Sequence, residues 1–468
     1  NETRADEERL QLHLAVGAAR ERVYLSYPRV ELRESRPRVP SFYVLDVVRA
    51  TTGGIPRYAE LAERVSRAGG ASLAWPAPQD PARAIDDFEH DLAVLLPLVT
   101  ERDRKKVHGR ARYLIDLNAA LRRSVTERWA RWQPRWSKAD GLVTPSADAL
   151  AVLASERLTE RPYSLTGLQR YAACPYQFLL SAIYRLAPLE EPAPLQRLDP
   201  LTRGSLFHEI QATFLRQLHD ERKLPVTAAS LAAAKGKLEW VVGHVTKEAA
   251  DKLAPAIERV WKDEVASLRR DLLLWLEKLA EDGREWTPEH FEFAFGLPPE
   301  PGRDPASTPE PAVVDGRFKL RGSVDLVERH QTQRALRVTD HKTGKNRTNL
   351  ATIVDGGRVL QPVLYGLALE ALTGDTVYEG RLSYCTTAGG FTEHHIPLVD
   401  ISRRRGLEVL EIIDRAIERG VLAARPQPHR DTCRYCDFQP VCGRDEERRT
   451  SRKPEAAVAD LEALRRLG

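Results

Sequence analysis

Acidic and basic side chains suited to metal-dependent chemistry end two segments in the second half of the chain. Asp325 lies in the alternating segment G-S-V-D-L-V, and Asp340 and Lys342 end the segment L-R-V-T-D-H-K. A β-strand turns residues two apart to the same face, so we expect Asp340 and Lys342 to lie side by side. Carboxylate oxygens hold Mg2+, which polarises a phosphate and lowers the pKa of its bound water. A lysine beside them positions that water or stabilises the charge of the transition state. These residues predict metal-dependent hydrolysis of a phosphodiester.

A histidine upstream adds a nitrogen donor to this set. His208 lies in G-S-L-F-H-E, on a segment predicted to be helical. A histidine among oxygen ligands suits Mn2+ as well as Mg2+. Taken alone, the spacing of Asp340 and Lys342 is more typical of a surface ion pair, so the interpretation depends on the segments occurring together.

The cysteines form a second pattern that could bind metal. Cys433, Cys436 and Cys442 are spaced C-x2-C-x5-C, and Cys174 stands alone far upstream. This spacing favours metal binding in a reducing cytoplasm over disulfide bonds. Cys385 lies in an apolar segment and is expected to be a core residue.

The elements that must position these groups alternate between helix and strand. Ser164 is a plausible N-cap for a helix over 165–186, and another helix begins near Gly204. The segment 298–316 has the composition of a loop. The pattern predicts an α/β core with long amphipathic helices to about 279, strands near 290–296, 316–329, 335–344 and 381–387, and a helix over 360–372.

Four blocks in this order resemble the RecB-like branch of the PD-(D/E)XK nuclease superfamily. They are G-x-x-x-H at 204–208, G-x-x-D at 322–325, D-x-K-T-G at 340–344 and Q-x-x-x-Y at 361–365, and the resemblance covers 162–443. It implies a restriction-endonuclease-like fold, in which a mixed sheet is flanked by helices, with large helical insertions and a mostly helical region in front.

The resemblance also implies roles for individual residues. The metal ligands would be His208, Asp325, Asp340 and the backbone carbonyl of His341. Lys342 would serve catalysis, and Glu209 would support His208 from outside the ligand set. Gln361 and Tyr365 would lie at the edge of the site and contact DNA.

The cysteines fit the same resemblance. AddB-type nucleases and CRISPR-associated iron–sulfur exonucleases carry one cysteine before the nuclease core and three after it. Cys174, Cys433, Cys436 and Cys442 are therefore expected to hold a [4Fe–4S] cluster that pins the last segment to the first helix. A zinc ion with four cysteine ligands is the alternative, since C-x2-C is common to both. The five-residue gap and the remote cysteine favour iron–sulfur.

The first 45 residues resemble the end of a superfamily 1 helicase motor. The segment is expected to form a helix, a strand over 22–27, and a second helix after Ser41. Ala18 occupies the position of the motif's phosphate-contacting arginine, and Arg20 keeps a flanking basic position. No G-x-x-x-x-G-K-[ST] loop occurs in the chain, so we expect no ATP hydrolysis. An ordinary amphipathic helix and strand is the simpler alternative.

A basic, tryptophan-containing stretch follows within a region predicted to be mostly helical. Arginines and lysines dominate 102–135, and Trp129, Trp132 and Trp136 occur in W-A-R-W-Q-P-R-W. The spacing favours a buried helical stripe with solvated arginines. The alternative is a surface for a single nucleic-acid strand, in which phosphates bind the cations and bases stack on the rings.

The predicted domains are a degenerate helicase-like end at 1–45, a helical, partly basic connecting region at 46–160 and the nuclease with its four-cysteine cluster site at 161–468.

Composition bounds the function only loosely. The 468 residues are 42% hydrophobic and 29% charged, with a net charge of +4, as in soluble globular proteins. No apolar run is long enough to span a membrane and the start is charged, so we expect a cytoplasmic protein. The chain begins at Asn1, so we expect either a piece of a longer protein or a chain that has lost its initiator.

The expected function is the metal-dependent DNA exonuclease domain of a helicase–nuclease in double-strand-break resection and recombinational repair. Its partners would be single-stranded DNA and a helicase subunit similar to AddA. Its cofactors would be Mg2+ or Mn2+ and the [4Fe–4S] cluster. The alternatives are a standalone iron–sulfur exonuclease of the CRISPR-associated type and a non-catalytic DNA-binding scaffold.

Overall fold

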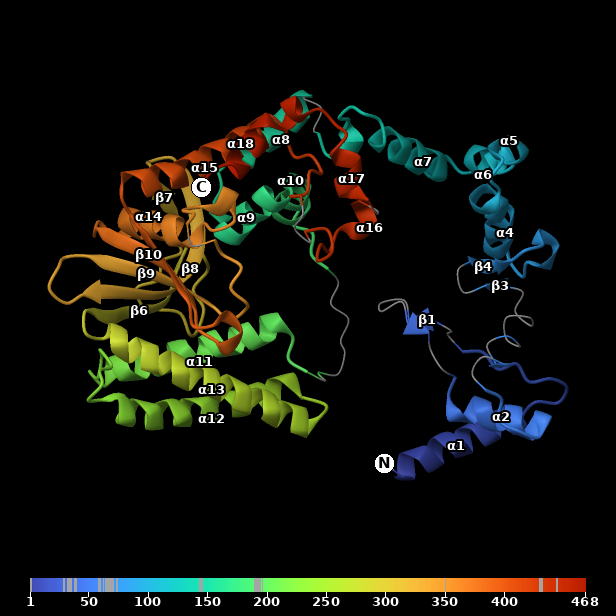
Figure 1. Cartoon of the computed structure of the whole chain (residues 1–468), viewed down its shortest axis with the longest axis horizontal. Coiled ribbons are helices and arrows are strands. Elements are labelled where there is room, and N and C mark those ends of the chain that lie inside the picture. Colours follow the sequence, from blue (N-terminus) through green and yellow to red (C-terminus); the bar gives the residue numbers. More distant parts are fainter. Residues whose placement is uncertain are drawn as a thin grey trace. The chain divides into compact units, whose positions relative to one another are not determined.

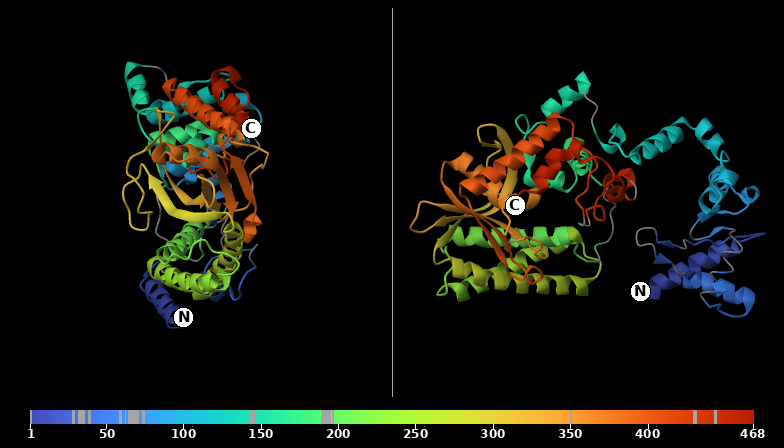
Figure 2. Two further views of the ribbon diagram at one scale, coloured as in Figure 1. Left: turned by 90° about the vertical axis from the view of Figure 1, so that its left-hand side faces the viewer. Right: turned by 45° about the horizontal axis from the view of Figure 1, so that its top comes forward.

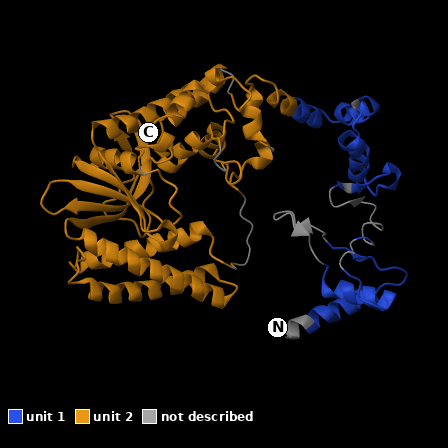
Figure 3. Ribbon diagram, viewed as in Figure 1, with its two compact units in different colours: residues 1–126 blue, residues 127–468 orange. Residues whose placement is uncertain are grey.

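The chain divides into two compact units, 1–126 and 127–468 (Figure 3). A computed structural model describes residues 2–27, 30–31, 36–37, 40–57, 60–61, 63, 71–72, 75–142, 146–188, 195, 197–349, 351–428, 432–442 and 445–468. Among these residues, no helix is long and apolar enough to cross a bilayer. The predicted domain limits at 45 and 160 stay predictions.

The first unit is built mainly of helices. Its α2 (Phe42–Thr52) begins after Ser41, as predicted. The strand predicted over 22–27 is wrong, because this segment pairs with no other strand of the described chain. Ala18 directly follows α1 (Glu2–Gly17). The other elements are β1 (Val30–Glu31), β2 (Arg36–Pro37), β3 (Ala71–Ser72), β4 (Trp75–Pro78), α4 (Asp87–Thr100), α5 (Arg104–Val107), α6 (Arg112–Leu117) and the start of α7 (Ala119–Arg131).

A mixed sheet forms the centre of the second unit (Figure 1). Its long strands are β6 (Trp286–Phe295), β8 (Phe318–His330), β9 (Leu336–Lys342), β10 (Val377–Tyr384) and β11 (Glu393–Pro397). Antiparallel pairing joins β6 to β8, β8 to β9 and β10 to β11, whereas β9 and β10 run parallel. Two short strands, β5 (Tyr163–Ser164) and β7 (Ala312–Val314), pair with the start of β8.

Helices cover both faces of this sheet, and each face has its own core (Figure 2). On one face lie α11 (Pro200–Asp220), α12 (Leu231–Leu253) and α13 (Glu258–Asp282), with Phe291 and Leu326 of the sheet packed against them. This face also buries Cys385, as predicted. On the other face lie α9 (Leu165–Ala173), α14 (Gln361–Thr373), α15 (Asp400–Glu418) and α18 (Ala459–Arg465).

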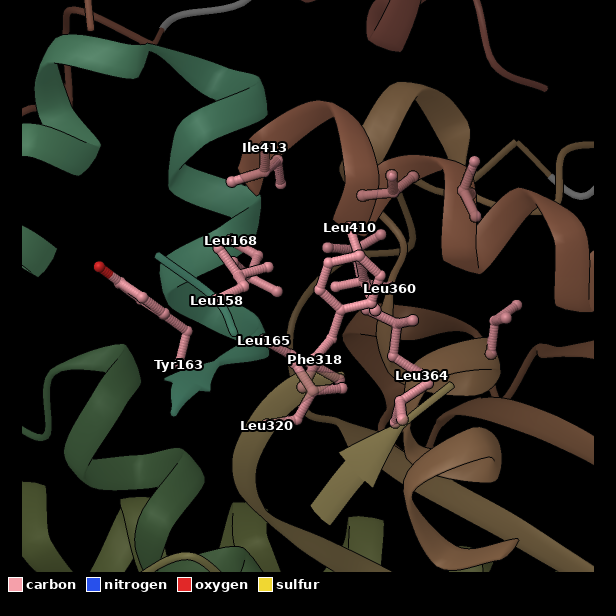
Figure 4. Packing of buried hydrophobic residues seen from close by; sticks show 14 of the residues in the cluster. Leu158, Tyr163, Leu165, Leu168, Phe318, Leu320, Leu360, Leu364, Leu410 and Ile413 are labelled. Atoms are coloured by element: carbon pink, nitrogen blue, oxygen red, sulfur yellow. The ribbon is translucent and has the colours of Figure 1, made fainter. Parts of the chain in front are cut away.

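Large aliphatic side chains hold the second core together. Figure 4 shows Leu168 of α9, Leu364 of α14 and Leu410 of α15 converging, all fully buried. Each buried leucine contributes about 1.5–3 kcal/mol relative to an exposed one. The α/β class with a mixed sheet between helices is thereby confirmed.

The helix predicted over 165–186 is interrupted at Cys174. Ser164 caps α9 as predicted, with its hydroxyl accepting the Gly167 N–H at 3.2 Å. The helix then stops, because a residue before proline avoids the helical conformation, and Cys174 is extended at φ −164°. A short α10 (Pro175–Phe178) and a π-helical turn (Leu179–Ile183) follow. The break leaves Cys174 at a junction between helices.

The buried tryptophan stripe is wrong for two of its three members. Trp129 and Trp132 are 65% and 45% exposed. The α7 helix ends at Arg131, so helical spacing does not continue to Trp132 and Trp136. The buried side chain is instead Arg131, which donates to Glu446 at 3.0 Å. The interpretation as a surface for a single nucleic-acid strand stays a prediction.

The segment after residue 127 packs on the end of the chain. Lys453 donates to the buried Asp140 carboxylate at 2.8 Å, and Trp136 donates to the Pro454 carbonyl at 2.7 Å. These contacts explain why the segment from residue 127 belongs to the second unit. The remaining helices of this region are α8 (Ala147–Ser155), α16 (Gln439–Cys442) and α17 (Glu446–Thr450).

Candidate active site

The helix α11 carries the predicted histidine into a cavity of about 720 Å3. Asp199 caps this helix by accepting the N–H groups of Leu201 and Thr202, and Pro200 occupies the first helical position. The apolar side of α11 packs on the sheet and on α12, so the opposite stripe faces the cavity. His208 and Glu209 lie on the cavity wall.

Strand pairing brings the two predicted aspartates together. Leu326 of β8 pairs with Thr339 of β9, which sets Asp325 opposite Asp340. The Asp325 carboxylate accepts the His341 N–H at 2.6 Å and lies 3.4 Å from His208 Nδ1. Lys342 Nζ lies 2.5 Å from Asp340 Oδ2. Asp325, Asp340, His341 and Lys342 all line the cavity with His208.

Glu292 of β6 also belongs to this group, although the four sequence blocks do not include it. Ligand atoms of His208, Glu292 and Asp325 all lie within 4.8 Å of one another. Glu292 accepts a hydrogen bond from the Ser323 hydroxyl at 3.0 Å. Its backbone has φ 57°, a left-handed conformation that is costly in the middle of a strand. The sequence signal that could have identified Glu292 is a lone carboxylate among the phenylalanines of F-E-F-A-F.

The electrostatics of the group centre on His208. Burial opposes its charge, but the Asp325 and Glu292 carboxylates outweigh burial and raise the pKa of His208 to about 10. Burial and the His208 charge act in opposite directions on Asp325, and the pKa of Asp325 falls to about 2. Burial lowers the pKa of His341 to about 4. Burial disfavours a charged Lys342, but the neighbouring Asp340 raises its pKa above the usual value.

This donor set fits a divalent cation. One imidazole and two carboxylates converge at distances that a single ion can bridge, and Asp340 lies next to them. Nitrogen with oxygen donors suits Mn2+ and Mg2+. A cation would take the place of the proton on His208, because a ligating imidazole is neutral. The role of the His341 carbonyl as a ligand stays a prediction.

The structure places Gln361 and Tyr365 outside the lining of the cavity. The Gln361 amide pairs with Gln169 of α9 at 2.8 Å. The Tyr365 ring packs against Gly322, where a Cβ atom would come within 2.8 Å of the ring. Both residues are buried, and Tyr365 packs behind the strand that carries Asp325, near the site carboxylates. Contact of either residue with DNA stays a prediction.

A loop from the sheet forms the opposite wall of the cavity. Pro301 and Gly302 line it. The loop is fastened by buried Asp304, which accepts the Phe291 N–H at 2.9 Å and contacts His290 Nδ1 at 3.1 Å. The predicted loop over 298–316 is thus an ordered wall that also contains β7.

The four predicted cysteine ligands line one small cavity of their own. Backbone hydrogen bonds bring its parts together, since the Gln427 N–H donates to the Ala173 carbonyl at 2.9 Å. All four thiols are free. Within the described part of the chain, no three cysteine sulfurs lie within 4.8 Å of one another. A zinc ion with 2.3 Å bonds would hold its sulfurs about 3.8 Å apart.

Comparison with known proteins agrees with this geometry. The sequence profile of the PD-(D/E)XK nuclease superfamily matches residues 162–443. Two relatives, from Lacticaseibacillus casei and Lacticaseibacillus paracasei, are each named as the B subunit of an ATP-dependent helicase/deoxyribonuclease. Each is 29% identical over 217 residues, which is 45% of this chain and 17% of the relative. The family profile spans more than half of the chain and includes the whole histidine–carboxylate–lysine site, so this protein belongs to the PD-(D/E)XK nuclease superfamily.

Proposed function

We propose that this chain is the DNA-cleaving part of a helicase–nuclease that resects double-strand breaks for recombinational repair. The observation that carries the proposal is the meeting of His208, Glu292 and Asp325 beside the Asp340–Lys342 pair in one cavity. The similarity to the B subunits of two helicase/deoxyribonucleases favours this interpretation over a standalone exonuclease. The convergent donors favour an enzyme over a non-catalytic scaffold.

The chain's own residues have distinct tasks in phosphodiester cleavage. His208, Glu292, Asp325 and Asp340 would hold Mg2+ or Mn2+, which supplies Lewis acidity and an activated water. Lys342 keeps a positive charge at the cavity wall and stabilises the negative charge that develops on the phosphate. Asp340 holds the Lys342 ammonium in place at 2.5 Å.

The substrate we propose is single-stranded DNA, delivered by a partner helicase subunit similar to AddA. Ala18 cannot supply a charge to a nucleotide phosphate, and the sequence has no phosphate-binding loop. We therefore expect this chain to hydrolyse no ATP. DNA-stimulated ATPase activity of the purified chain would contradict that expectation.

We also propose that the four-cysteine cavity holds a [4Fe–4S] cluster. Each thiolate of such a cluster binds a different iron, so its sulfurs spread further apart than around one zinc ion. The gathering of all four thiols around one cavity and the apolar lining by Pro426 and Phe438 support this assignment. The cluster would join the end of α9 to the segment around α16.

The test is cleavage of labelled single-stranded DNA by the purified chain. Degradation should require Mg2+ or Mn2+ and stop with a chelator. Asp340→Ala and Lys342→Ala should each lower the rate about 100-fold or more while the fold is kept. Lys319→Ala is the matched control, because this lysine of β8 donates to the Glu160 carbonyl and does not line the cavity. Undiminished cleavage by both site variants would exclude the proposed site.

A further inference from the structure

One stripe of α11 continues along the cavity well beyond His208. Ser205, His208, Ala212 and Arg216 follow each other at helical spacing and all line the cavity. Arg216 comes eight residues after His208, which is about 12 Å farther along the helix axis. Between them, Glu209, Ala212 and Thr213 also line the cavity, so one cavity extends from the metal-binding group to Arg216.

Arg216 is half-buried and has no acidic partner within the described part of the chain. Its guanidinium donates a hydrogen bond from Nη2 to the Gly302 carbonyl on the opposite wall. Its Nε is buried without a hydrogen-bond partner. By contrast, Arg203 on the same helix meets Asp271 at 2.9 Å. A partly desolvated guanidinium without a counter-ion is unfavourable, so the free protein leaves a place for an anion.

We infer that Arg216 binds a phosphate of the substrate strand other than the one being cut. This inference rests on the proposed nuclease function. A guanidinium presents a planar fork of donors that matches phosphate oxygens, and a strand in the cavity carries phosphates at regular intervals. With the metal-binding group at one end and Arg216 at the other, two phosphates are held at a fixed separation. Arg216 thereby sets the register of the strand and so the bond that is cut.

The experiment uses single-stranded oligonucleotides in which one phosphodiester at a time is replaced by an uncharged methylphosphonate. The wild-type chain is expected to lose about 10- to 100-fold in kcat/KM when the linkage bound by Arg216 is neutral. That linkage should lie on one defined side of the cut. In Arg216→Gln, the unmodified strand should be cut more slowly by the same factor, and the neutral linkage should cause no further loss. Arg216→Lys should keep part of the effect, because it retains the charge without the fork.

Controls separate this role from a structural one. Arg303→Gln changes an arginine of the same loop whose guanidinium already binds Glu300 at 2.7 Å, and it should behave as wild type. Melting temperature and Mn2+ affinity should be unchanged in Arg216→Gln.

The remaining outcomes distinguish the inference from the function on which it rests. If Arg216→Gln cuts as fast as wild type, the inference is overturned. It is overturned equally if the variant is slower on every strand but keeps the sensitivity to the neutral linkage, because Arg216 would then only fasten the loop through Gly302. If the wild-type chain cuts no DNA, the proposed function itself fails.

Discussion

At the scale of single residues, the site depends on an acid whose position is set by strand pairing. Phe291 pairs with Leu326 and Phe293 pairs with Val324, so Glu292 stands opposite Asp325. The backbone of Glu292 has a positive φ, which is unusual in a strand, at the point where the carboxylates approach His208. From this unfavourable backbone geometry at such a point, we expect Glu292 to take part in binding the metal ion.

Glu292→Gln tests this role. The amide keeps the size of the side chain but removes the charge, so Mn2+ affinity should fall by at least about tenfold. Isothermal titration with Mn2+ measures it without any need for activity. Glu289→Gln is the control, since Glu289 lies on the same strand but pairs with Arg329 at 2.8 Å. Equal affinities of the two variants would exclude Glu292 from the ligand set.

The residues that sequence patterns can identify are those whose partners lie close along the chain. Asp340 and Lys342 share a strand, so their contact follows from spacing alone. His208 could be assigned to the site only from the order of the motifs. Glu292 could be assigned only from the register between β6 and β8, which the sequence does not show. Gln361 and Tyr365 occur in the expected motif and are buried against Gln169 and Gly322, and neither is among the residues that line the cavity. Which way a buried side chain faces depends on tertiary packing that the motif does not encode.

At the scale of elements, a charged network crosses the sheet on the side of β10 and β11. Arg381 of β10 donates to buried Glu328 of β8 at 3.0 Å and to Glu393 of β11 at 3.1 Å. His395 of β11 lies 3.1 Å from both Glu379 and Glu393. Hydrogen bonds to these carboxylates raise the pKa of His395 to about 9, against the opposing effects of burial and the Arg381 charge.

The network makes stability depend on pH in a defined direction. An unfolded histidine has a pKa of about 6.5, so between pH 6.5 and 9 the folded chain binds the extra proton. The stabilisation by His395 is complete below about pH 6.5 and is lost as the pH rises to about 9. Because the side chain is 41% exposed, solvent screening limits the effect to about 1 kcal/mol.

Urea unfolding of wild type and His395→Gln at pH 6.5 and 9.5 measures this effect. The free energy of unfolding should differ at the lower pH and converge at the higher one. His244→Gln on α12 is the control, because this histidine is 52% exposed and lies 3.3 Å from one glutamate. A difference between wild type and His395→Gln that stays constant with pH would contradict the assignment.

Local chemistry predicts where elements begin better than where they are interrupted. Ser164 starts a helix by capping it with its hydroxyl, and Ser41 precedes a helix without a side-chain cap. Both stand directly before an apolar periodic segment, which is a local signal. The break at Cys174 follows from Pro175, a signal that the apolar periodicity of 165–186 concealed. The segment 22–27 has strand-like composition but no partner strand among the described residues, and a strand exists only when paired.

At the scale of the second unit, the C-terminal end of the unit packs against its first segments near the cysteines. Arg465 of α18 donates to the Ala172 carbonyl at 3.2 Å, next to Cys174. Arg131 donates to the Val441 carbonyl at 3.3 Å, next to Cys442. These contacts join the segments before and after the sheet next to the four-cysteine cavity. The proposed cluster would add a further link between the two ends of the unit.

Cys174→Ala tests that link in the intact chain. Protein prepared without oxygen should be brown and contain iron, and the variant should lose the colour and most of the iron. Its melting temperature should fall, because the binding energy of a metal site is also folding energy. Cys385→Ala is the matched control: this buried cysteine lies in the core against α11 to α13 and outside the thiol cavity, so its variant should stay brown. A colourless wild-type protein with one zinc ion per chain would establish the four-cysteine zinc site instead, and iron retained in Cys174→Ala would remove Cys174 from the ligands.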